Sequence, residues 1–483
     1  MNTEININDH RITLFYFFDH HCPVEKLNSN SITFPVSFSA KPQPLWENHS
    51  YNLNKDLISS IHQLFHYNNH SIKSWHFSKQ YLRSVNQANI QLQLRKRSKQ
   101  RLQQTQDDEK NTASSIRLIF EQLLHHKFRS GFSIACLELK LSSKQQLTLT
   151  QLNETVSALA RFNKLKLNNS NNTYSLGQLI RLLHGESTSE KDKAKRVYTH
   201  SYLQTNNNTP FTEQHSQDII SRLALHYTSD YQIKNTQGRV ETIDDYHNVT
   251  HALAQEGSAT LVQLNSNDAP EILKNYKNAV IRPAHQPIHL LAVHLENAMQ
   301  QYQKLTSYWI NQPKKLKKHT HILADIEHQL RNFRLNFFHP VISHINSHNQ
   351  IQQKLYRVKQ LDAQFNHLGK NTDIISQLIK HQHQTRYCKL ASFGVAAAGY
   401  LTSFSIIKEG IESLNEWQIL KQAAPHITEN LHHYTRSLSL VGSLIIFLCI
   451  WIIAHRHCKH SDHHSHGASH HALEALHKRH PLE

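Results

Sequence analysis

Two long runs without a charged side chain constrain the fold of this chain more than any other feature of its sequence. Leu390–Ile407 and Ser437–Ala454 each contain 18 residues without Asp, Glu, Lys or Arg. An α-helix rises about 1.5 Å per residue, so each run would cover roughly 27 Å, close to the hydrocarbon thickness of a bilayer. We therefore predict two transmembrane helices, at 390–407 and 437–454, joined by an extracytoplasmic loop. The alternative for the first run, which is rich in Gly and Ala, is a buried helix of a soluble domain.

The charges that flank the two runs predict their orientation. Basic residues precede the first run and follow the second: Lys380, Arg386, Lys389, Arg456 and Lys459. The connecting segment has Lys408 and Arg436 at its edges, and its interior is acidic. By the positive-inside rule, both termini should be cytoplasmic. We expect a multi-pass protein of the cell inner membrane, with the lipid bilayer as its first partner.

Length and composition limit what precedes the first run. A chain of 483 residues suffices for roughly two to four structural units. Only 11 glycines and 12 prolines occur, which favours helices joined by polar loops over a glycine-rich nucleotide-binding fold. The net charge is +17, but the basic residues are scattered, and we do not expect nucleic acid as a partner. We predict a mostly helical chain in which residues 1–280 form a soluble α+β domain.

Hydrophobic periodicity divides residues 1–280 into strands and helices. Strand character is present at Leu14–Phe18, Ile32–Phe38, Asn89–Leu94 and Ser133–Leu141. Helical periodicity is present at Leu57–His66, Ser115–His126 and Leu149–Phe162. Together these segments predict a domain of mixed secondary structure without an internal repeat.

Residues 281–389 are predicted to form a long helical stalk. Gln286–Gln312 has the apolar spacing of one helix, which Pro313 ends. Further along, apolar residues recur at spacings of three, four or seven and lie on one face of a second helix: Ile351, Leu355, Val358, Leu361, Phe365, Leu368, Ile375 and Ile379. This helix could run continuously into the membrane. We expect its apolar stripe to form a coiled coil in a homo-oligomer, with packing inside one chain as the alternative.

The last part of the chain, 455–483, is a histidine-rich tail that we expect in the cytoplasm. Imidazole and thiol groups crowd its first half, in His455, His457, Cys458, His460, His463, His464, His466, His470 and His471. These groups are good ligands for zinc, copper and nickel, and a flexible tail can bring several of them to one ion. The tail is therefore predicted to bind a metal ion. The alternative is compositional bias, since the chain carries 41 histidines in total.

No catalytic motif is present in the sequence. The chain lacks GxSxG, HExxH and a phosphate-binding glycine loop, so an enzyme is the less favoured class. Five polar positions outside the tail could serve a site assembled in space: Glu256, Gly257, His285, His289 and His294. We expect local capping and surface exposure to account for them.

The order of parts from Ile351 to His460 resembles the CorA-type divalent-cation transporters. That family has a large α+β cytoplasmic domain, a long helix entering the membrane, a second span and a short basic tail. Its Gly-Met-Asn signature after the first span is absent here, where residues 408–412 read Lys-Glu-Gly-Ile-Glu. The resemblance implies a pentamer whose first span lines a pore. Ser392, Tyr400, Thr402 and Ser403 would then offer oxygens to a partly hydrated magnesium ion.

Two functional hypotheses follow. The first is an oligomeric divalent-cation transporter or channel, indicated by a hairpin after a long helix and by acidic and histidine-rich flanks. The second is a membrane-tethered sensing or interaction protein, in which the soluble domain binds a partner and the hairpin is an anchor. A secreted protein that inserts into another membrane is a third hypothesis, in keeping with the Asn-rich, Gly-poor composition.

Overall fold

The chain folds into two compact units. The computed structural model describes residues 5, 7–19, 22–28, 44–66, 71–93, 116–143, 146–161, 164–166, 173–186, 195–206, 211–228, 239–246, 248–264, 269–310, 320–416, 437 and 439–453. The first unit comprises 1–308 and 328–371, and the second comprises 309–327 and 372–483. The region expected to form a stalk, 281–389, is therefore divided between the two units.

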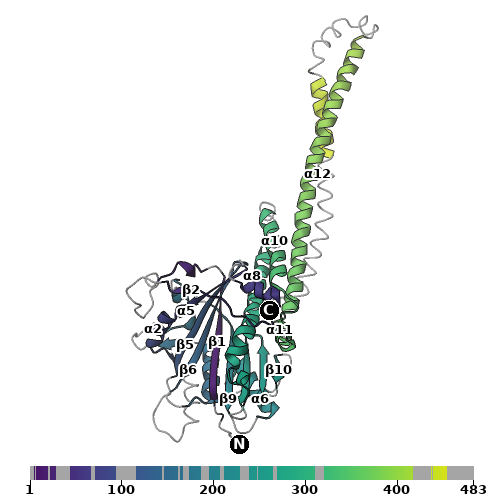
Figure 1. The fold of residues 1–483 in the computed structure, drawn as a ribbon. Coiled ribbons are helices and arrows are strands. Elements are labelled where there is room, and N and C mark those ends of the chain that lie inside the picture. The colour runs from purple at the N-terminus through teal and green to yellow at the C-terminus, as the bar shows by residue number, and fades with distance from the viewer. Residues whose placement is uncertain are drawn as a thin grey trace. The chain divides into compact units, whose positions relative to one another are not determined.

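The first unit is built on one large β-sheet (Figure 1). Its strands are β1 (Ile7–Phe18), β2 (Trp46–Asn48), β3 (Ile72–Phe77), β4 (Gln91–Gln93), β5 (Arg117–Phe128), β6 (Ser133–Ser142), β7 (Lys164–Lys166), β8 (Thr173–Tyr174), β9 (Lys195–Asn206), β10 (Val240–Tyr246), β11 (Val249–Ala254) and β12 (Gly257–Leu264). The described strands form a 12-stranded sheet in the order β10-β11-β12-β9-β1-β6-β5-β4-β7-β8, while β3 pairs with β5 and β2 with β3. The central strand β1 is antiparallel to both β6 and β9, whereas β9 and β12 are parallel. The predicted order, a domain containing strands followed by helices, is confirmed.

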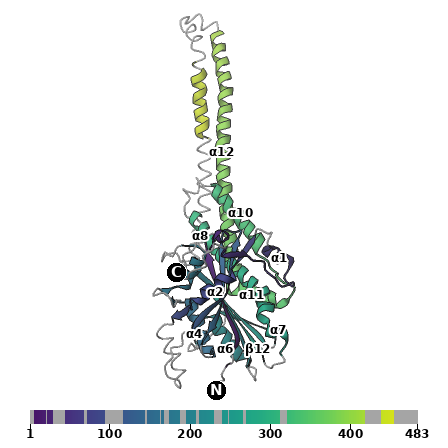
Figure 2. The ribbon, with the colours of Figure 1, turned by 60° about the vertical axis from the view of Figure 1, so that its left-hand side comes forward.

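Helices cover both faces of this sheet. Neighbouring residues of a strand point to opposite faces. In β12, Leu261 joins the core that contains α2 (Lys79–Gln87), α4 (Leu149–Arg161), α5 (Leu176–Leu183) and α6 (Glu213–Ala224), whereas Val262 packs with α7 (Glu271–Lys274). Figure 2 shows α6 and α7 beside β12. Burial on both faces explains why β1 is almost entirely buried from His10 to Phe18.

The second face carries the elements that position the candidate site. η2 (Lys277–His285) is a π-helical segment that leads directly into α8 (Gln286–Ile310), and α11 (Asn346–Val358) lies against β10 and β11. All residues of α8 from Gln286 to Met299 are buried, as expected for a helix inside a domain. The ring of His294 stacks on Phe128 of β5, with 3.7 Å between the ring centroids. This contact packs α8 against the sheet. Phe337, at the end of α10 (Thr320–Phe337), packs on the same phenylalanine.

Several local predictions are confirmed by the structure. Leu14–Phe18 lies in β1, Asn89–Leu94 contains β4, and Ser133–Leu141 lies in β6. The predicted helices at Leu57–His66, Leu149–Phe162 and Gln286–Gln312 correspond to α1 (Ser59–Phe65), α4 and α8. Ile32–Phe38 lies outside the described residues.

The helix predicted at Ser115–His126 is wrong, because this segment is strand β5. Its pairing with β6 shifts register between Phe120 and Gln122, so one extra residue interrupts the alternation of inward and outward side chains. In the main core the buried positions therefore fall at Leu118, Phe120 and Leu123. The step of three residues from Phe120 to Leu123 imitates a helical spacing.

The apolar stripe from Ile351 to Ile379 lies on two helices and not on one. α11 ends at Val358, and α12 (Leu361–Glu416) begins three residues later. Between them Gln360 has a φ of 53°, a left-handed conformation that ends a helix. The side chain of Lys359 is buried beside this break, where its ammonium group contacts Glu296 of α8.

The second unit contains two apolar helices. α12 runs without interruption from Leu361 through Leu390–Gly410, so the predicted continuous helix is confirmed from Leu361 onward and wrong before it, where the break after Val358 separates α11. Among the described helices, this segment alone is long and apolar enough to cross a membrane, and the helix Ser439–Ile453 is shorter. The two helices contact each other: a Cβ on Gly399 would lie 2.7 Å from Cδ1 of Ile450, and the ring of Phe447 packs against Phe393 and Tyr400. Of the two predicted spans, the first thus meets the length and composition of a membrane helix, and the second does not within its described residues.

Candidate functional site

An open groove of about 560 Å³ lies beside η2 in the first unit. Its walls are the loop between β2 and α1, strand β5, and η2 with the first residue of α8. The lining residues are His49, Ser50, Tyr51, Asn52, Leu53, Asn54, Lys55, Asp56, Gln122, Leu124, Asn278, Ala279, Arg282, Pro283 and Gln286. This volume is in the range of sites for small molecules. Amide, hydroxyl and imidazole side chains dominate the lining, and no sequence motif groups these residues.

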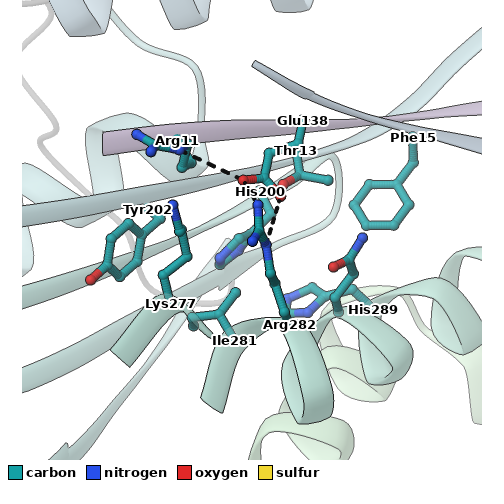
Figure 3. Close-up of a pocket in the computed structure, with 11 residues that line it drawn as sticks. Arg11, Thr13, Phe15, Glu138, His200, Tyr202, Lys277, Ile281, Arg282 and His289 are labelled. Carbon is teal, nitrogen blue, oxygen red and sulfur yellow. Dashed lines mark hydrogen bonds and ion pairs between the residues drawn. The ribbon is translucent and has the colours of Figure 1, made fainter. Parts of the chain in front are cut away.

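Arg282 of η2 is the most constrained charged residue of the groove. Its Nη2 and Nε donate to the two carboxylate oxygens of Glu138 in β6, at 2.7 and 3.2 Å (Figure 3). Its Nη1 donates to the side-chain oxygen of Asn278 at 2.9 Å. The side chain of Glu138 is only 5% exposed, so it needs this bidentate partner. None of these three residues was predicted as a site residue.

Further charge pairs tie η2 to the sheet. Arg11 of β1 is paired with Asp9 and with Glu121 of β5. Its Nε also lies 3.7 Å from Glu138. Lys277, the first residue of η2, lies 3.7 Å from Asp9 and 3.9 Å from Glu121. The charges around the groove therefore neutralise one another to a large extent.

A second, very small cavity of about 10 Å³ lies between η2 and the sheet (Figure 3). Arg11, Glu138, Lys277 and His200 contribute to its lining, and it shares Arg282 with the groove. Its volume suits about one water molecule. Within the described residues, the Nε2 atom of His200 is buried without a hydrogen-bond partner, so such a water would find an acceptor or donor there.

A chain of hydrogen bonds ends at the wall of the groove. The Tyr51 hydroxyl lies 3.1 Å from Nε2 of His126, and Nδ1 of His126 lies 3.0 Å from the Ser74 hydroxyl. Burial lowers the pKa of His126 to about 3, so the imidazole is neutral at pH 7. A neutral imidazole donates through one nitrogen and accepts through the other. His126 therefore fixes the hydroxyl of Tyr51 and leaves it capacity for one further partner.

Five histidines form a buried cluster where β9, β11, η2, α8 and α11 each contribute one ring: His200, His251, His285, His289 and His348. Ring centroids are 4.9 Å apart for His200 and His289, and 5.1 Å apart for His251 and His285. The Ser258 hydroxyl lies between His200 and His289, at 2.8 and 3.1 Å. Burial lowers the pKa of His289 to about 4 and holds the pKa of His200 and His285 well below 6.5. The expectation that His285, His289 and His294 are exposed is wrong, because all three are buried.

Metal binding was predicted for residues that the structure does not describe. The nine candidate ligands from His455 to His471 lie beyond the described part of the chain. Within the described ranges, there is no group of three or more His, Cys, Asp or Glu side chains that could hold a metal ion. Zinc, copper or nickel binding by the tail stays a prediction.

The four pore-lining candidates lie along α12 in the second unit. The hydroxyl of Ser392 donates to the Cys388 carbonyl at 2.7 Å, Thr402 donates to Ala398, and Ser403 donates to Tyr400 at 3.0 Å. The ring of Tyr400 packs on Phe447 of the neighbouring helix. Each of these hydroxyl hydrogens is thus donated within α12, and the pore role stays a prediction.

Comparisons with protein family models, curated proteins and solved structures gave no match to this chain. The resemblance to the CorA-type transporters therefore remains one of layout. The function has to be argued from the geometry of the two units.

Proposed function

We propose that the chain is a membrane-tethered binding protein. In this proposal the apolar helices of the second unit anchor the chain in a bilayer, and the first unit binds a small ligand in its groove. The observation that carries the anchor is the exposed apolar surface of α12. Leu390, Val395, Leu401 and Ile406 are each more than 60% exposed in the folded chain. Transfer of one such side chain out of water stabilises a protein by about 1.5–3 kcal/mol, and a bilayer would bury all of them.

The groove supports a binding role for the first unit. It combines a volume suited to a small molecule with several polar side chains from the loop after β2, from β5 and from η2. Cation transport is the second candidate, and its support is the continuous helix α12 and the layout that it shares with CorA-type transporters. The pairing of the apolar helices as a transmembrane hairpin, with both termini in the cytoplasm, belongs to the proposal.

Membrane anchoring can be tested with two matched substitutions. Leu401→Arg places a charge in the centre of the apolar segment, where insertion should cost about 2.5–3.5 kcal/mol. Leu335→Arg is the control, because Leu335 is 72% exposed and lies in α10, outside that segment. We expect Leu401→Arg to reduce the carbonate-resistant, membrane-bound fraction strongly, and Leu335→Arg to leave it unchanged.

Two results would count against the tether. A chain lacking residues 390–454 that still floats with liposomes would show that membrane contact lies elsewhere. Metal-ion flux through the full chain in liposomes, with loss of flux on Ser392→Ala and Thr402→Val, would favour the transporter.

A further inference from the structure

We propose that the groove of the first unit binds an uncharged, polyhydroxylated ligand of the sugar or polyol class. This inference rests on the proposed function, because it names the ligand of the same groove. It follows from three properties of the lining: the guanidinium of Arg282 is already paired, several amides make no hydrogen bond within the described residues, and the aromatic ring is already packed.

The charged groups of the groove are poorly placed to hold an anion. All three nitrogens of the Arg282 guanidinium donate within the protein, to Glu138 and Asn278. A phosphate or carboxylate is usually held by a free guanidinium fork or ammonium group. The remaining charged residues are Lys55 and Asp56, whose opposite charges are adjacent in the chain. Burial and the nearby His76 lower the pKa of His49 to about 4, so this imidazole is neutral as well.

Free amide groups supply the recognition. The side chains of Asn52, Gln122 and Gln286 line the groove and make no hydrogen bond inside the described part of the chain. Gln286 is only 8% exposed, and it also lines the small cavity beneath η2. The Gln286 amide lines both spaces, where water or a ligand can complete its hydrogen bonds.

Hydroxyl groups match this set of free groups. Each amide presents both a donor and an acceptor, and so does each hydroxyl of a sugar. Neighbouring ligand hydroxyls can therefore be satisfied together by the three amides, while the Tyr51 hydroxyl is held by His126.

A flat nucleobase fits the lining less well. Base recognition uses an aromatic face as a stacking platform. The ring of Tyr51 packs edge-on with His49 and with Phe65, each at 4.9 Å between centroids, and it tilts against His126. The tyrosine ring is thus held by three protein rings and is not free to stack on a base.

The test uses the full chain in a detergent without a sugar head group. Saturation-transfer NMR is recorded with glucose, galactose, mannose and inositol, and with glucose 6-phosphate and glucuronate as charged counterparts. We expect transfer to at least one uncharged probe and no tighter binding of the charged counterparts. Gln286→Met should weaken the binding of that probe at least tenfold, and Asn52→Ala should weaken it as well. Gln80→Met, at an exposed position of α2 outside the groove, should leave it unchanged.

The variants keep the inference testable even if one of them misfolds. Asn52 is exposed, so its truncation should not disturb the fold if the buried Gln286 proves sensitive. The proposal is overturned if no uncharged probe gives transfer, if a charged counterpart binds more than tenfold tighter, or if Asn52→Ala leaves affinity unchanged. Flotation with liposomes tests the tether separately, so failure of the ligand class and failure of the tether are distinguishable.

Discussion

Mild acid should unfold the first unit, because many of its histidines are buried in the neutral form. Burial lowers the pKa of His10, His184 and His289 to about 4, and of His126, His226 and His294 to about 3. Burial also lowers the pKa of His200 and His285 well below 6.5. Each of these eight residues is at most 5% exposed.

The sign and size of the effect follow from proton linkage. A histidine has a pKa of about 6.5 in the unfolded chain, so below that pH the unfolded state binds more protons than the folded state. The free energy of unfolding is therefore undiminished above pH 6.5 and decreases as the pH falls toward 4. At pH 5.5 each such histidine lowers the free energy of unfolding by about 1.4 kcal/mol, or by about 11 kcal/mol for eight. This is comparable to the whole stability of a typical domain, about 5–15 kcal/mol.

The assay is urea unfolding of the full chain in detergent between pH 7.5 and 5.5, followed by tryptophan fluorescence. Near pH 6 the eight histidines should give an uptake of about six protons on unfolding, which is a slope of about 8 kcal/mol per pH unit. His328→Gln is the control, because His328 is exposed and should not change the slope. His294→Leu should lower the uptake by about 0.8 proton. A slope below about 3 kcal/mol per pH unit would refute the reasoning.

Three further predictions concern buried contacts, and each is measured by chemical unfolding at pH 7.5. Lys359→Met leaves Glu296 buried without its ion pair and should lower the free energy of unfolding by about 3–5 kcal/mol. The double variant Lys359→Met with Glu296→Leu should lose clearly less, because no buried charge remains. Equal losses for the two variants would contradict this. Gly257→Ala should destabilise the fold by about 1–3 kcal/mol, because the new Cβ would lie 2.6 Å from the Ala224 carbonyl oxygen. Gly369→Ala is the matched control: its Cβ would meet no atom within 4 Å, so it should stabilise α12 by up to about 1 kcal/mol. Arg282→Met removes the bidentate partner of Glu138 and should cost about 2–4 kcal/mol. A loss under about 0.5 kcal/mol would show that Arg11, whose Nε lies 3.7 Å from Glu138, suffices as its partner.

Sequence periodicity predicted correctly the elements whose apolar spacing is regular. It failed where the pairing of distant strands determines which residues are buried. β1, β6, α4 and α8 follow from their apolar spacing. β5 does not, because its bulge after Phe120 exists only through the pairing with β6. The register shift is a property of two strands, and a pattern in one of them cannot reveal it.

The buried histidines show a second limit of sequence reasoning. His285, His289 and His294 are polar by type, and polar residues near a helix start are usually exposed. The segment from Ile288 to Met299 is, however, apolar around most of its circumference, which is the pattern of a helix buried on all sides. That signal predicts burial for any residue within the segment, including a histidine. An interpretation based on the apolar neighbours in the segment, and not on the polarity of histidine itself, would have predicted that these three histidines are buried.

The groove shows why net charge is a weak guide to a ligand. The chain carries a formal charge of +17, which by itself points to anionic partners. Around the groove, however, Arg282 is paired with Glu138, which lies 144 residues away in the sequence, and Arg11 with Glu121, 110 residues away. A charge that is already paired and hydrogen-bonded offers little to a ligand, whereas a free amide offers both a donor and an acceptor. The chemistry of the site is therefore set by the groups that remain without a partner, and these can be identified only after the fold has brought distant charges together.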